Sequence, residues 1–549
     1  MTAGLARLAG RDDLLACLLL AVFAILAGGS SQLMTHTYDE GAHYAYGWKI
    51  LTFDASRGRD DSKMPFSALN ALPGRIATVL GPGSLRSRLE TIEFGRYMTV
   101  AAGVLLGWLV FRWAGALYGP PAGLLALTLL VLDPNILAHA GLVTSDLYAT
   151  WMTALTIWSF WRFLAHAGAG AWRAATVSAG AFGLAQLSKY TCVYLAPILV
   201  LIALGHAAPA LWALARGGAY RALGGRVIQA GKYAALYVAA FLLFANIGYW
   251  GEGSFKRLSD YSFRSGPFLA VQARLAPLAG LRVPVAAPYL EGLDRVLANE
   301  RGGFNVYLLG RFGKDGVHGR PFPEYYAVAW LYKEPIPTQV LLLLALAAYT
   351  LGFRRFHFRR DEWPLVAAVL AFAWYFTFVF NYQIGIRYAL VVHPLLFVLA
   401  GSLLRDSGTL SRGARVALAG LLVWLGVSTV SRYPHFLAYF NEFVPDRTQA
   451  YRVLIDSNLD WGQSGRYVER YLRRHPDVVL EPGGPQAGTM LVSANNLAGL
   501  RGPERFRWLR ENFAPVGHVA YTHLLFRVTP EALRRVTDPI PPDAGDKVN

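Results

Sequence analysis

The stretch THTYDEGAHYAYG, residues 35–47, combines two adjacent carboxylates with histidine and aromatic side chains. Asp39 and Glu40 follow a long apolar run directly, so we expect them at a membrane surface. They could simply begin a helix, with Asp39 near its N-cap and Glu40 in its first turn. Alternatively, they supply a catalytic base or a metal ligand, and the neighbouring His43 and Tyr44 favour a shaped pocket for this second role.

A further carboxylate, Asp146, occurs in the segment LVTSDLYAT. As a structural alternative, Ser145 and Asp146 would cap the helix that follows. The expected side of the membrane favours a functional role, because Asp39, Glu40 and Asp146 are all predicted at the same face. Carboxylates that converge at a membrane edge indicate a site.

Three basic residues are expected near that same face: Lys63 in DDSKMPF, Lys189 in QLSKYT and Arg387 in IGIRYAL. Any one of them could be an interfacial side chain that extends to the lipid headgroups. Together they are suited to a phosphate, which arginine binds through its planar fork and lysine as a point charge. The sequence therefore predicts an anion-binding role for all three.

The segment IDSNLDWGQ, residues 455–463, gathers polar groups and a tryptophan. A structural turn explains Asn458 and the glycine that follows. Such side chains also form sugar pockets, in which polar groups match hydroxyls and an aromatic face covers the ring. We therefore include Asn458, Asp460 and Trp461 among the predicted substrate-binding residues.

These residues must be positioned by helices in a lipid bilayer. The 549-residue chain is 54% apolar and only 16% charged, whereas soluble proteins carry about 25% charged residues. A single helix over 174–207 would be about 50 Å long, so Gln186, Ser188 and Lys189 are predicted to divide it. Eleven membrane spans of roughly 20 residues follow, at 14–33, 97–114, 121–140, 147–165, 174–188, 190–207, 233–250, 336–352, 363–380, 388–404 and 414–431.

Charge decides the expected orientation. The net charge of +17 comes from basic clusters between the apolar runs, which argues against nucleic-acid binding. A cytoplasmic N-terminus puts these clusters inside the cell, as the positive-inside rule requires. The clusters contain Arg7, Arg11, Arg112, Arg162, Arg173, Arg216, Arg221, Arg226, Lys232, Arg354, Arg355, Arg359, Arg360, Arg405, Arg412 and Arg415.

The predicted architecture is an all-α polytopic membrane domain, residues 1–431, followed by a small α/β domain, residues 432–549. Two large loops, about 35–96 and 251–335, and the C-terminal domain lie outside the cell in this arrangement. Within the C-terminal domain we expect a helix over 451–475 and a strand over 518–528. The sequence lacks the Cys/His zinc spacings, HExxH and the Walker-type nucleotide motif.

Seven motifs in order resemble one family: TYDEGAHYAYG, GRYMTV, ILAHAGLVTSDLYAT, GLAQLSKYT, YLLGR, IGIRYALVVHPLLFVLAG and DSNLDWGQ. They resemble the bacterial phospholipid-carrier-dependent glycosyltransferases of the GT-C superfamily, related to protein O-mannosyltransferases and lipid A aminoarabinose transferases. The resemblance implies Asp39 as general base and Glu40 as a supporting or metal-binding group. It also matches Asp146 to the family's second acidic position and Lys189 to its lysine after the fifth span.

The resemblance implies a transferase that moves a hexose or pentose from a polyprenyl-phosphate donor to a protein, lipid or glycan acceptor, with inversion expected at the anomeric carbon. The expected location is the bacterial inner membrane, with the reaction at its outer face. No cofactor is required by this reading, although a divalent metal on Glu40 and Asp146 stays open. The alternatives are a transporter or flippase of lipid-linked sugars, and a glycan polymerase or ligase.

Overall fold

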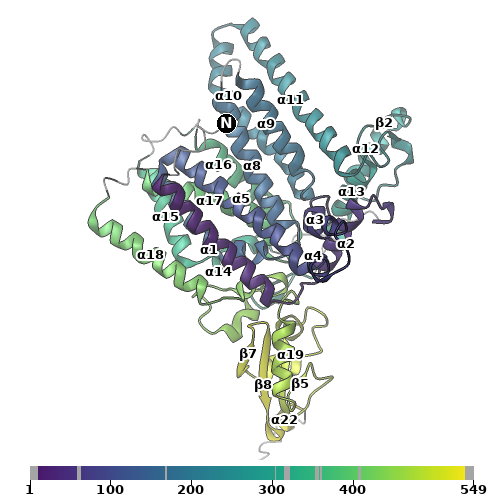
Figure 1. The fold of residues 1–549 in the computed structure, drawn as a ribbon, viewed down its shortest axis with the longest axis vertical. Helices are drawn as coiled ribbons and strands as arrows, with labels where there is room; N and C mark the ends of the chain where they lie inside the picture. The colour runs from purple at the N-terminus through teal and green to yellow at the C-terminus, as the bar shows by residue number, and fades with distance from the viewer. Residues whose placement is uncertain are drawn as a thin grey trace, which may run out of the picture.

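The computed structural model is a helical bundle that carries a small β-sheet at one end (Figure 1). It describes residues 10–57, 63–166, 170–302, 305–313, 322–352, 358, 361–405, 408 and 410–537. The basic residues Arg7, Arg354, Arg355, Arg359 and Arg360 lie outside the described residues.

All eleven predicted spans coincide with helical segments, which confirms the predicted fold class. Among the described residues, six helices are long and apolar enough to cross a membrane, or up to eight if each of two bent pairs counts as one span. The chain is therefore a multi-pass membrane protein. The helices of the bundle are α1 (Arg11–Leu33), α5 (Ile92–Tyr118), α6 (Pro120–Val131), α7 (Pro134–Ala140), α8 (Asp146–Ala165), α9 (Gly170–Ala185), α10 (Leu195–Arg216), α11 (Tyr220–Gly248), α14 (Tyr325–Lys333), α15 (Ile336–Leu351), α16 (Trp363–Phe378), α17 (His393–Ala400) and α18 (Arg412–Val430).

Several of these helices are interrupted at polar residues. The predicted division between the fifth and sixth spans is confirmed, because α9 ends at Ala185 and the 3-10 helix η2 begins at Tyr190. The pair α6 and α7 is bent by 65°, and the pair α14 and α15 by 114°. The tenth span starts as a 3-10 helix, η6 (Ile386–Val392), before it becomes α17. Each interruption brings polar backbone and side chains into the interior of an otherwise apolar bundle.

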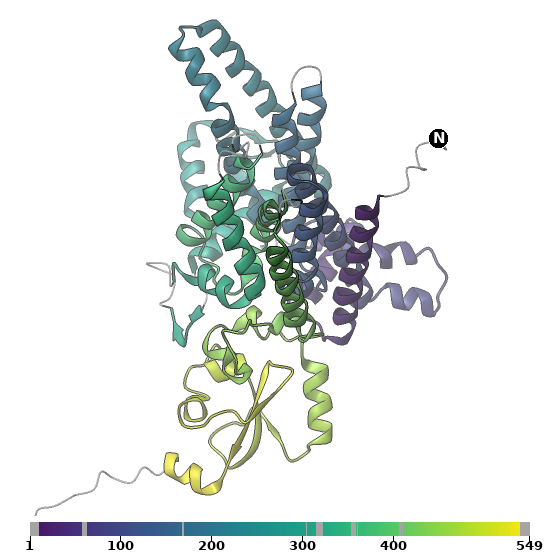
Figure 2. The same ribbon diagram turned by 90° about the vertical axis from the view of Figure 1, so that its left-hand side faces the viewer.

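Helices α10 and α11 extend beyond the rest of the bundle (Figures 1 and 2). Exposed apolar residues such as Leu204, Val227 and Val238 lie along them. In a bilayer these side chains face lipid, so their exposure is what a lipid-exposed helix pair requires. At the opposite end of α11, Tyr249 is buried in a small cluster with Met64 and Tyr289.

The loops between spans fold into short elements, most of them at one side of the bundle (Figure 1). Helices α2 and α3 pack closely there, because a side chain at Gly47 would come within 2.2 Å of the backbone oxygen of Ser67. These elements are α2 (Glu40–Leu51), α3 (Ser67–Ala77), α4 (Ser84–Leu89), α12 (Gly266–Arg274), α13 (Ala287–Gly302), and the two-stranded sheets β1–β2 (Lys256–Arg257, Arg282–Val283) and β3–β4 (Tyr307–Leu308, Arg311–Phe312).

After α18 the chain first runs against the bundle in three 3-10 turns, η9 (Phe436–Ala438), η10 (Arg447–Arg452) and η11 (Asp456–Asn458). The helix predicted over 451–475 is therefore wrong in extent, since α19 covers only Gly465–Arg474. The preceding residues instead bond to the bundle: the Thr35 N–H donates to the Gln463 carbonyl at 2.9 Å and the Tyr38 N–H to that of Trp461 at 3.2 Å.

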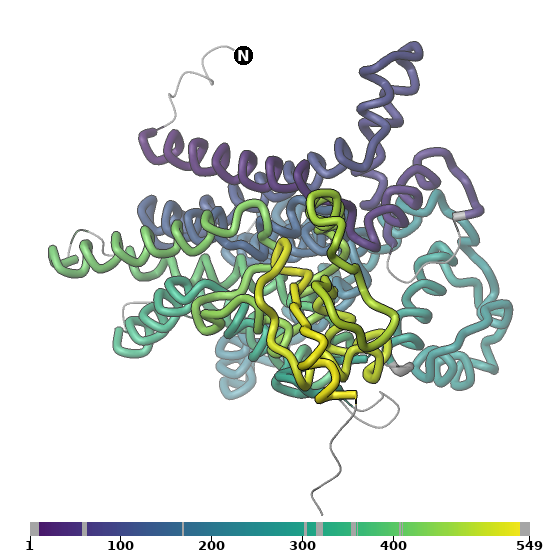
Figure 3. The backbone as a smooth tube through the Cα atoms, turned by 90° about the horizontal axis from the view of Figure 1, so that it is seen from below, coloured from purple at the N-terminus to yellow at the C-terminus, as the bar shows by residue number. Residues whose placement is uncertain are grey.

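A four-stranded sheet, of order β5–β6–β8–β7, follows these turns. The strand predicted over 518–528 is two strands, because Ala520 and Tyr521 adopt positive φ and turn the chain between β7 and β8. Viewed from this end, the sheet lies across the middle of the bundle (Figure 3). The strands are β5 (Val479–Leu480), β6 (Gly488–Ser493), β7 (Gly517–Val519) and β8 (His523–Val528), with short helices α20 (Ala494–Ala498), α21 (Arg507–Asn512) and α22 (Pro530–Thr537).

Candidate active site

A cavity of about 490 Å³ lies where the bundle meets the C-terminal segment. Its wall combines charged groups with aromatic and apolar side chains from segments far apart in sequence. Ligand sites in proteins typically have this size and this mixture. The cavity is lined by Tyr38, Asp39, Lys189, Tyr190, Thr191, Val296, Phe380, Tyr382, Ile384, Arg387, Tyr388, Asp456, Asp460, Trp461, Asn495, Leu500 and Arg501.

Arg387 joins the predicted acidic residues. Its Nη1 atom lies 3.5 Å from Oδ2 of Asp39 and 3.6 Å from Oδ2 of Asp146, and its guanidinium lies 4.2 Å from the ring centre of Trp461. Lys189 pairs with Oδ1 of Asp146. The structure therefore brings Asp39, Lys189, Arg387 and Trp461 together at one cavity. Asp146 does not line the cavity but contacts Lys189 and Arg387 from the bundle interior.

The exposure of the two carboxylates differs. The Asp146 side chain is 1% exposed and has a basic partner on each oxygen, whereas the Asp39 side chain is 37% exposed and has one described basic partner. Asp146 is thus suited to fixing the two cations, while Asp39 has room for a proton from a bound molecule.

Helix η6 carries Arg387, and the turn η11 fixes its position. Asn458 is fully buried, accepts the Ile386 N–H at 2.9 Å and donates to the Tyr325 hydroxyl at 2.9 Å. Gly385 is required at the contact, since a side chain there would come within 2.1 Å of the Ser457 hydroxyl. Asn458, which the sequence predicts to bind substrate, is not among the cavity-lining residues and holds the segment that presents Arg387.

Asp456 and Asp460 add two carboxylates to the cavity wall. Burial raises the pKa of Asp456 to about 6 and also raises that of Asp460. Asp456 has a φ of 59°, a left-handed conformation that Asp tolerates better than most residues. Strain of this kind concentrates at functional sites. Asp456 stands in the segment that the sequence singled out, but nothing in the pattern distinguished it from its neighbours.

Glu40 has a different environment from Asp39. Its fully buried carboxylate forms two contacts with the buried Arg96, at 2.7 and 2.8 Å. It also accepts the Thr37 N–H at 2.7 Å and the Val143 N–H at 3.0 Å. Because Arg96 neutralises Glu40 and basic side chains neutralise Asp146, the geometry does not favour these two residues as a metal site.

Three other predicted residues are not among those that line the cavity. His43 is buried and contacts the Ser67 hydroxyl at 3.1 Å; burial, helped by Lys63, lowers its pKa to about 4, so it is neutral at pH 7. Tyr44 is buried against Ala71. Lys63 is half-buried and close enough to act on His43.

The cavity also contains residues that the sequence did not indicate. Arg501 lies 5.4 Å from the ring centre of Tyr38, and Asn495 donates to the Asp460 carbonyl at 2.8 Å. Tyr388 lies beneath Lys189, whose Nζ is 4.1 Å from the ring centre. Arg501 and Asn495 follow the last recognisable motif by more than thirty residues, so only the folded chain reveals their position.

Comparison with known proteins agrees with the motifs. Residues 90–224 match the model of the family described as dolichyl-phosphate-mannose-protein mannosyltransferase. This match confirms the predicted resemblance to the GT-C glycosyltransferases that include the protein O-mannosyltransferases. No curated protein matches the chain in sequence.

Two solved structures align over most of the chain. ArnT from Cupriavidus metallidurans, bound to undecaprenyl phosphate, aligns at 12% identity and a TM-score of 0.47, covering 94% of this chain and 98% of that protein. The Archaeoglobus fulgidus oligosaccharyltransferase in its apo form aligns at 16% identity and a TM-score of 0.44, covering 84% of this chain and 60% of that protein.

Proposed function

We propose that this protein is a membrane glycosyltransferase that transfers a hexose or pentose from a polyprenyl-phosphate carrier to a protein, lipid or glycan acceptor. The observation that carries the proposal is Arg387, which lies between Asp39 and Asp146 at the wall of the cavity. A proton acceptor, cations for a phosphate and an aromatic face for a sugar are thereby within reach of one bound molecule.

In the proposed reaction, a hydroxyl or other nucleophile of the acceptor attacks the anomeric carbon of the donor sugar. The bond from that carbon to the phosphate oxygen breaks as the new glycosidic bond forms, and Asp39 takes the acceptor's proton. Attack opposite the leaving phosphate inverts the anomeric configuration. General base catalysis by one carboxylate contributes about 10²- to 10⁴-fold to such a reaction.

Arg387 and Lys189 hold the departing lipid phosphate. Both are fixed by Asp146, so little side-chain entropy is lost when the phosphate binds and their charge is already directed at the developing negative charge. Val296, Phe380 and Ile384 form an apolar part of the cavity wall, against which the first prenyl units of the carrier pack.

The proposed site lies at the outer face of a bacterial inner membrane, with the N-terminus in the cytoplasm and the C-terminal domain, residues 432–549, outside. The placement rests on the basic clusters, which the positive-inside rule assigns to the cytoplasmic face. Two residues of these clusters form ion pairs in the structure: Arg112 lies 3.8 Å from Asp13, and Arg405 lies 3.8 Å from Glu362. Asp13 stands at the start of α1, and the cavity residue Asp39 follows its other end.

Purified protein in lipid nanodiscs, incubated with a panel of polyprenyl-phosphate sugars and candidate acceptors, tests the proposal by mass spectrometry. Wild-type protein should release the carrier phosphate and transfer the sugar. Asp39→Asn should reduce transfer about 10³-fold while carrier-lipid binding is kept. Asp477→Asn is the control, since Asp477 is an exposed acid on the C-terminal segment.

Two results would contradict the proposal. Wild-type turnover by Asp39→Asn would remove this carboxylate from the reaction. If the wild type instead moved the lipid-linked sugar across liposomal membranes unchanged, the protein would be a transporter, and the cavity would be its binding site.

A further inference from the structure

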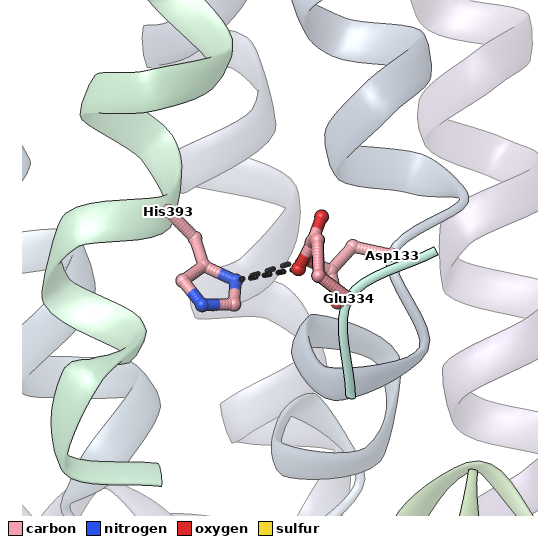
Figure 4. A group of neighbouring side chains, drawn as sticks. All are labelled: Asp133, Glu334 and His393. Carbon is pink, nitrogen blue, oxygen red and sulfur yellow. Dashed lines mark hydrogen bonds and ion pairs between the residues drawn. The ribbon is translucent and has the colours of Figure 1, made fainter. Parts of the chain in front are cut away.

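A second cluster of ionisable side chains lies inside the bundle, formed by Asp133, Glu334 and His393 (Figure 4). All three are at most 1% exposed at the side chain. None of them lines the cavity described above. The sequence gives no hint of the cluster, because the residues are far apart along the chain and form no metal-binding spacing.

Each member stands at an interruption of a membrane helix, directly before a proline. Asp133 separates α6 from α7, Glu334 separates α14 from α15, and His393 marks the change from η6 to α17. A residue before proline is disfavoured in the α conformation, and Asp133 and Glu334 are accordingly extended, with ψ angles of 115° and 136°, where their helices break. His393 keeps helical angles and marks only the change from 3-10 to α geometry. The three breaks therefore meet at one point.

Hydrogen bonds do not satisfy the cluster. His393 Nδ1 lies 3.0 Å from Oδ2 of Asp133 and 3.5 Å from Oε2 of Glu334, and a single N–H can serve only the nearer carboxylate. Oδ1 of Asp133 accepts the backbone N–H groups of Asn135 and Ile136. Within the described part of the chain, neither oxygen of Glu334 accepts a hydrogen bond.

Nearby positive charge does not fill this need. Lys333 is the adjacent residue, but its ammonium donates to the carbonyls of Leu437 and Asn458 at 2.8 and 2.6 Å. It forms no ion pair with either carboxylate among the described contacts. Two buried carboxylates with one imidazole between them are costly unless a further positive charge binds them.

We propose that Asp133, Glu334 and His393 bind a divalent transition-metal ion, Zn²⁺ in the first instance, which ties the three helix breaks together. Their ligand atoms lie within 4.8 Å of one another. Zinc bonds of about 2.1 Å at tetrahedral angles separate ligand atoms by about 3.4 Å, which is close to the two distances from His393. One nitrogen and two carboxylate oxygens suit zinc better than the all-oxygen ligands of magnesium or calcium.

The metal site is separate from the proposed reaction. His393 follows Arg387 by six residues, roughly 12 Å along a 3-10 helix with a rise of about 2 Å per residue. An ion at this point would fix the direction in which η6 presents Arg387 without contacting substrate. Its predicted role is structural.

Metal content of the full-length protein tests the inference directly. The protein is expressed in zinc-supplemented medium, because a buried site should bind its ion during folding. It is purified with an affinity tag that needs no metal column. Mass spectrometry of the elements should find about one zinc per chain in the wild type, and at least tenfold less in Glu334→Gln and His393→Gln. Glu469→Gln, an exposed glutamate on α19 paired with Arg473, should keep its metal.

A second measurement avoids variants that fail to fold. Wild-type protein produced with cobalt should show the visible absorption of tetrahedral Co²⁺, and prolonged chelation should lower its thermal midpoint. Less than one-tenth of a metal ion per chain in the wild type would overturn the proposal, as would equal metal content in Glu334→Gln and Glu469→Gln. If the wild type contains no metal and Glu334→Gln is more stable than the wild type, the two carboxylates bind a proton and not a metal ion.

Discussion

Asp39 and Glu40 are adjacent in sequence, yet they meet opposite environments. Glu40 is fully buried, and each of its oxygens has both a contact from Arg96 and a backbone N–H donor. Asp39 is 37% exposed, lines the cavity, and contacts Arg387 at 3.5 Å. Consecutive residues at a helix start point about 100° apart, so one carboxylate faces the bundle and the other the cavity.

The difference lies in how completely each pair is satisfied. Arg96 also donates to the carbonyls of Ser31, Met34 and Thr35, which leaves it fixed at the end of α1. Arg387, in contrast, keeps its Nε without a partner among the described residues. A saturated pair stabilises the fold, whereas an unsaturated one keeps the capacity to bind a ligand.

The largest expected effect breaks the structural pair. Glu40→Gln leaves the buried Arg96 without its counter-charge, which should lower the free energy of unfolding by about 3–5 kcal/mol. The measurement is the thermal midpoint in detergent together with the monodisperse fraction on size exclusion. Asp39→Asn should change stability by less than about 1 kcal/mol, because its ion pair is partly exposed.

An apolar pair gives the control for that experiment. Replacing Glu40 and Arg96 together by Met removes the unpaired charge. It should recover only part of the lost stability, because the backbone groups that the pair bonded lose their partners. Should Glu40→Gln be as stable as the wild type but inactive in transfer, Glu40 would belong to the chemistry and the contrast with Asp39 would be wrong.

Much of the candidate site could be predicted because it depends on helix ends. Asp39, Asp146, Lys189 and Arg387 each stand where an apolar run meets a polar segment, and the charge pattern assigns those ends to the same membrane face. Residues at these helix ends are confined to one layer at that membrane face, where they can come into contact. The helical membrane fold was predictable from the same apolar runs.

What could not be predicted depends on tertiary contacts. The full burial of Glu40 depends on its ion pair with Arg96, which comes from α5. The sequence pattern predicts that Asn458 binds a sugar, but it does not indicate that its side chain accepts the Ile386 N–H of η6. The buried triad joins residues 201 positions apart, from Asp133 to Glu334, and a local spacing rule has no access to such a pair.

Asp456 sharpens the comparison through its pH dependence. Its folded pKa, about 6, is higher than the value of about 3.9 in an unfolded chain. The folded state therefore binds the proton more tightly, so this group's favourable contribution is present below pH 4 and is lost as pH rises through 6. Asp456→Asn should raise stability above pH 6, by at most about 3 kcal/mol, and leave it unchanged below pH 4.

The measurement is thermal unfolding of Asp456→Asn and wild type between pH 4 and 8. Asn also adopts the left-handed conformation that this position requires, with a φ of 59°. A gain in stability with reduced transfer would identify Asp456 as a group kept for function at a cost to the fold. An equal stability difference at every pH would show that its carboxylate does not titrate in this range.

The smallest expected effect comes from replacing either Arg387 or Arg96 by lysine. Arg387→Lys keeps the charge but loses the planar fork that reaches Asp39 and Asp146 and the contact over Trp461 at 4.2 Å. We expect about a tenfold rise in KM for the lipid-linked donor, equivalent to about 1.4 kcal/mol, with little change in thermal midpoint. Arg96→Lys should do the reverse, lowering the midpoint while folded molecules keep the wild-type KM, because Arg96 is fully buried with Glu40. If both substitutions affected KM alike, the two carboxylates would share one function, and the division between a structural and a functional member of the Asp39–Glu40 pair would have to be abandoned.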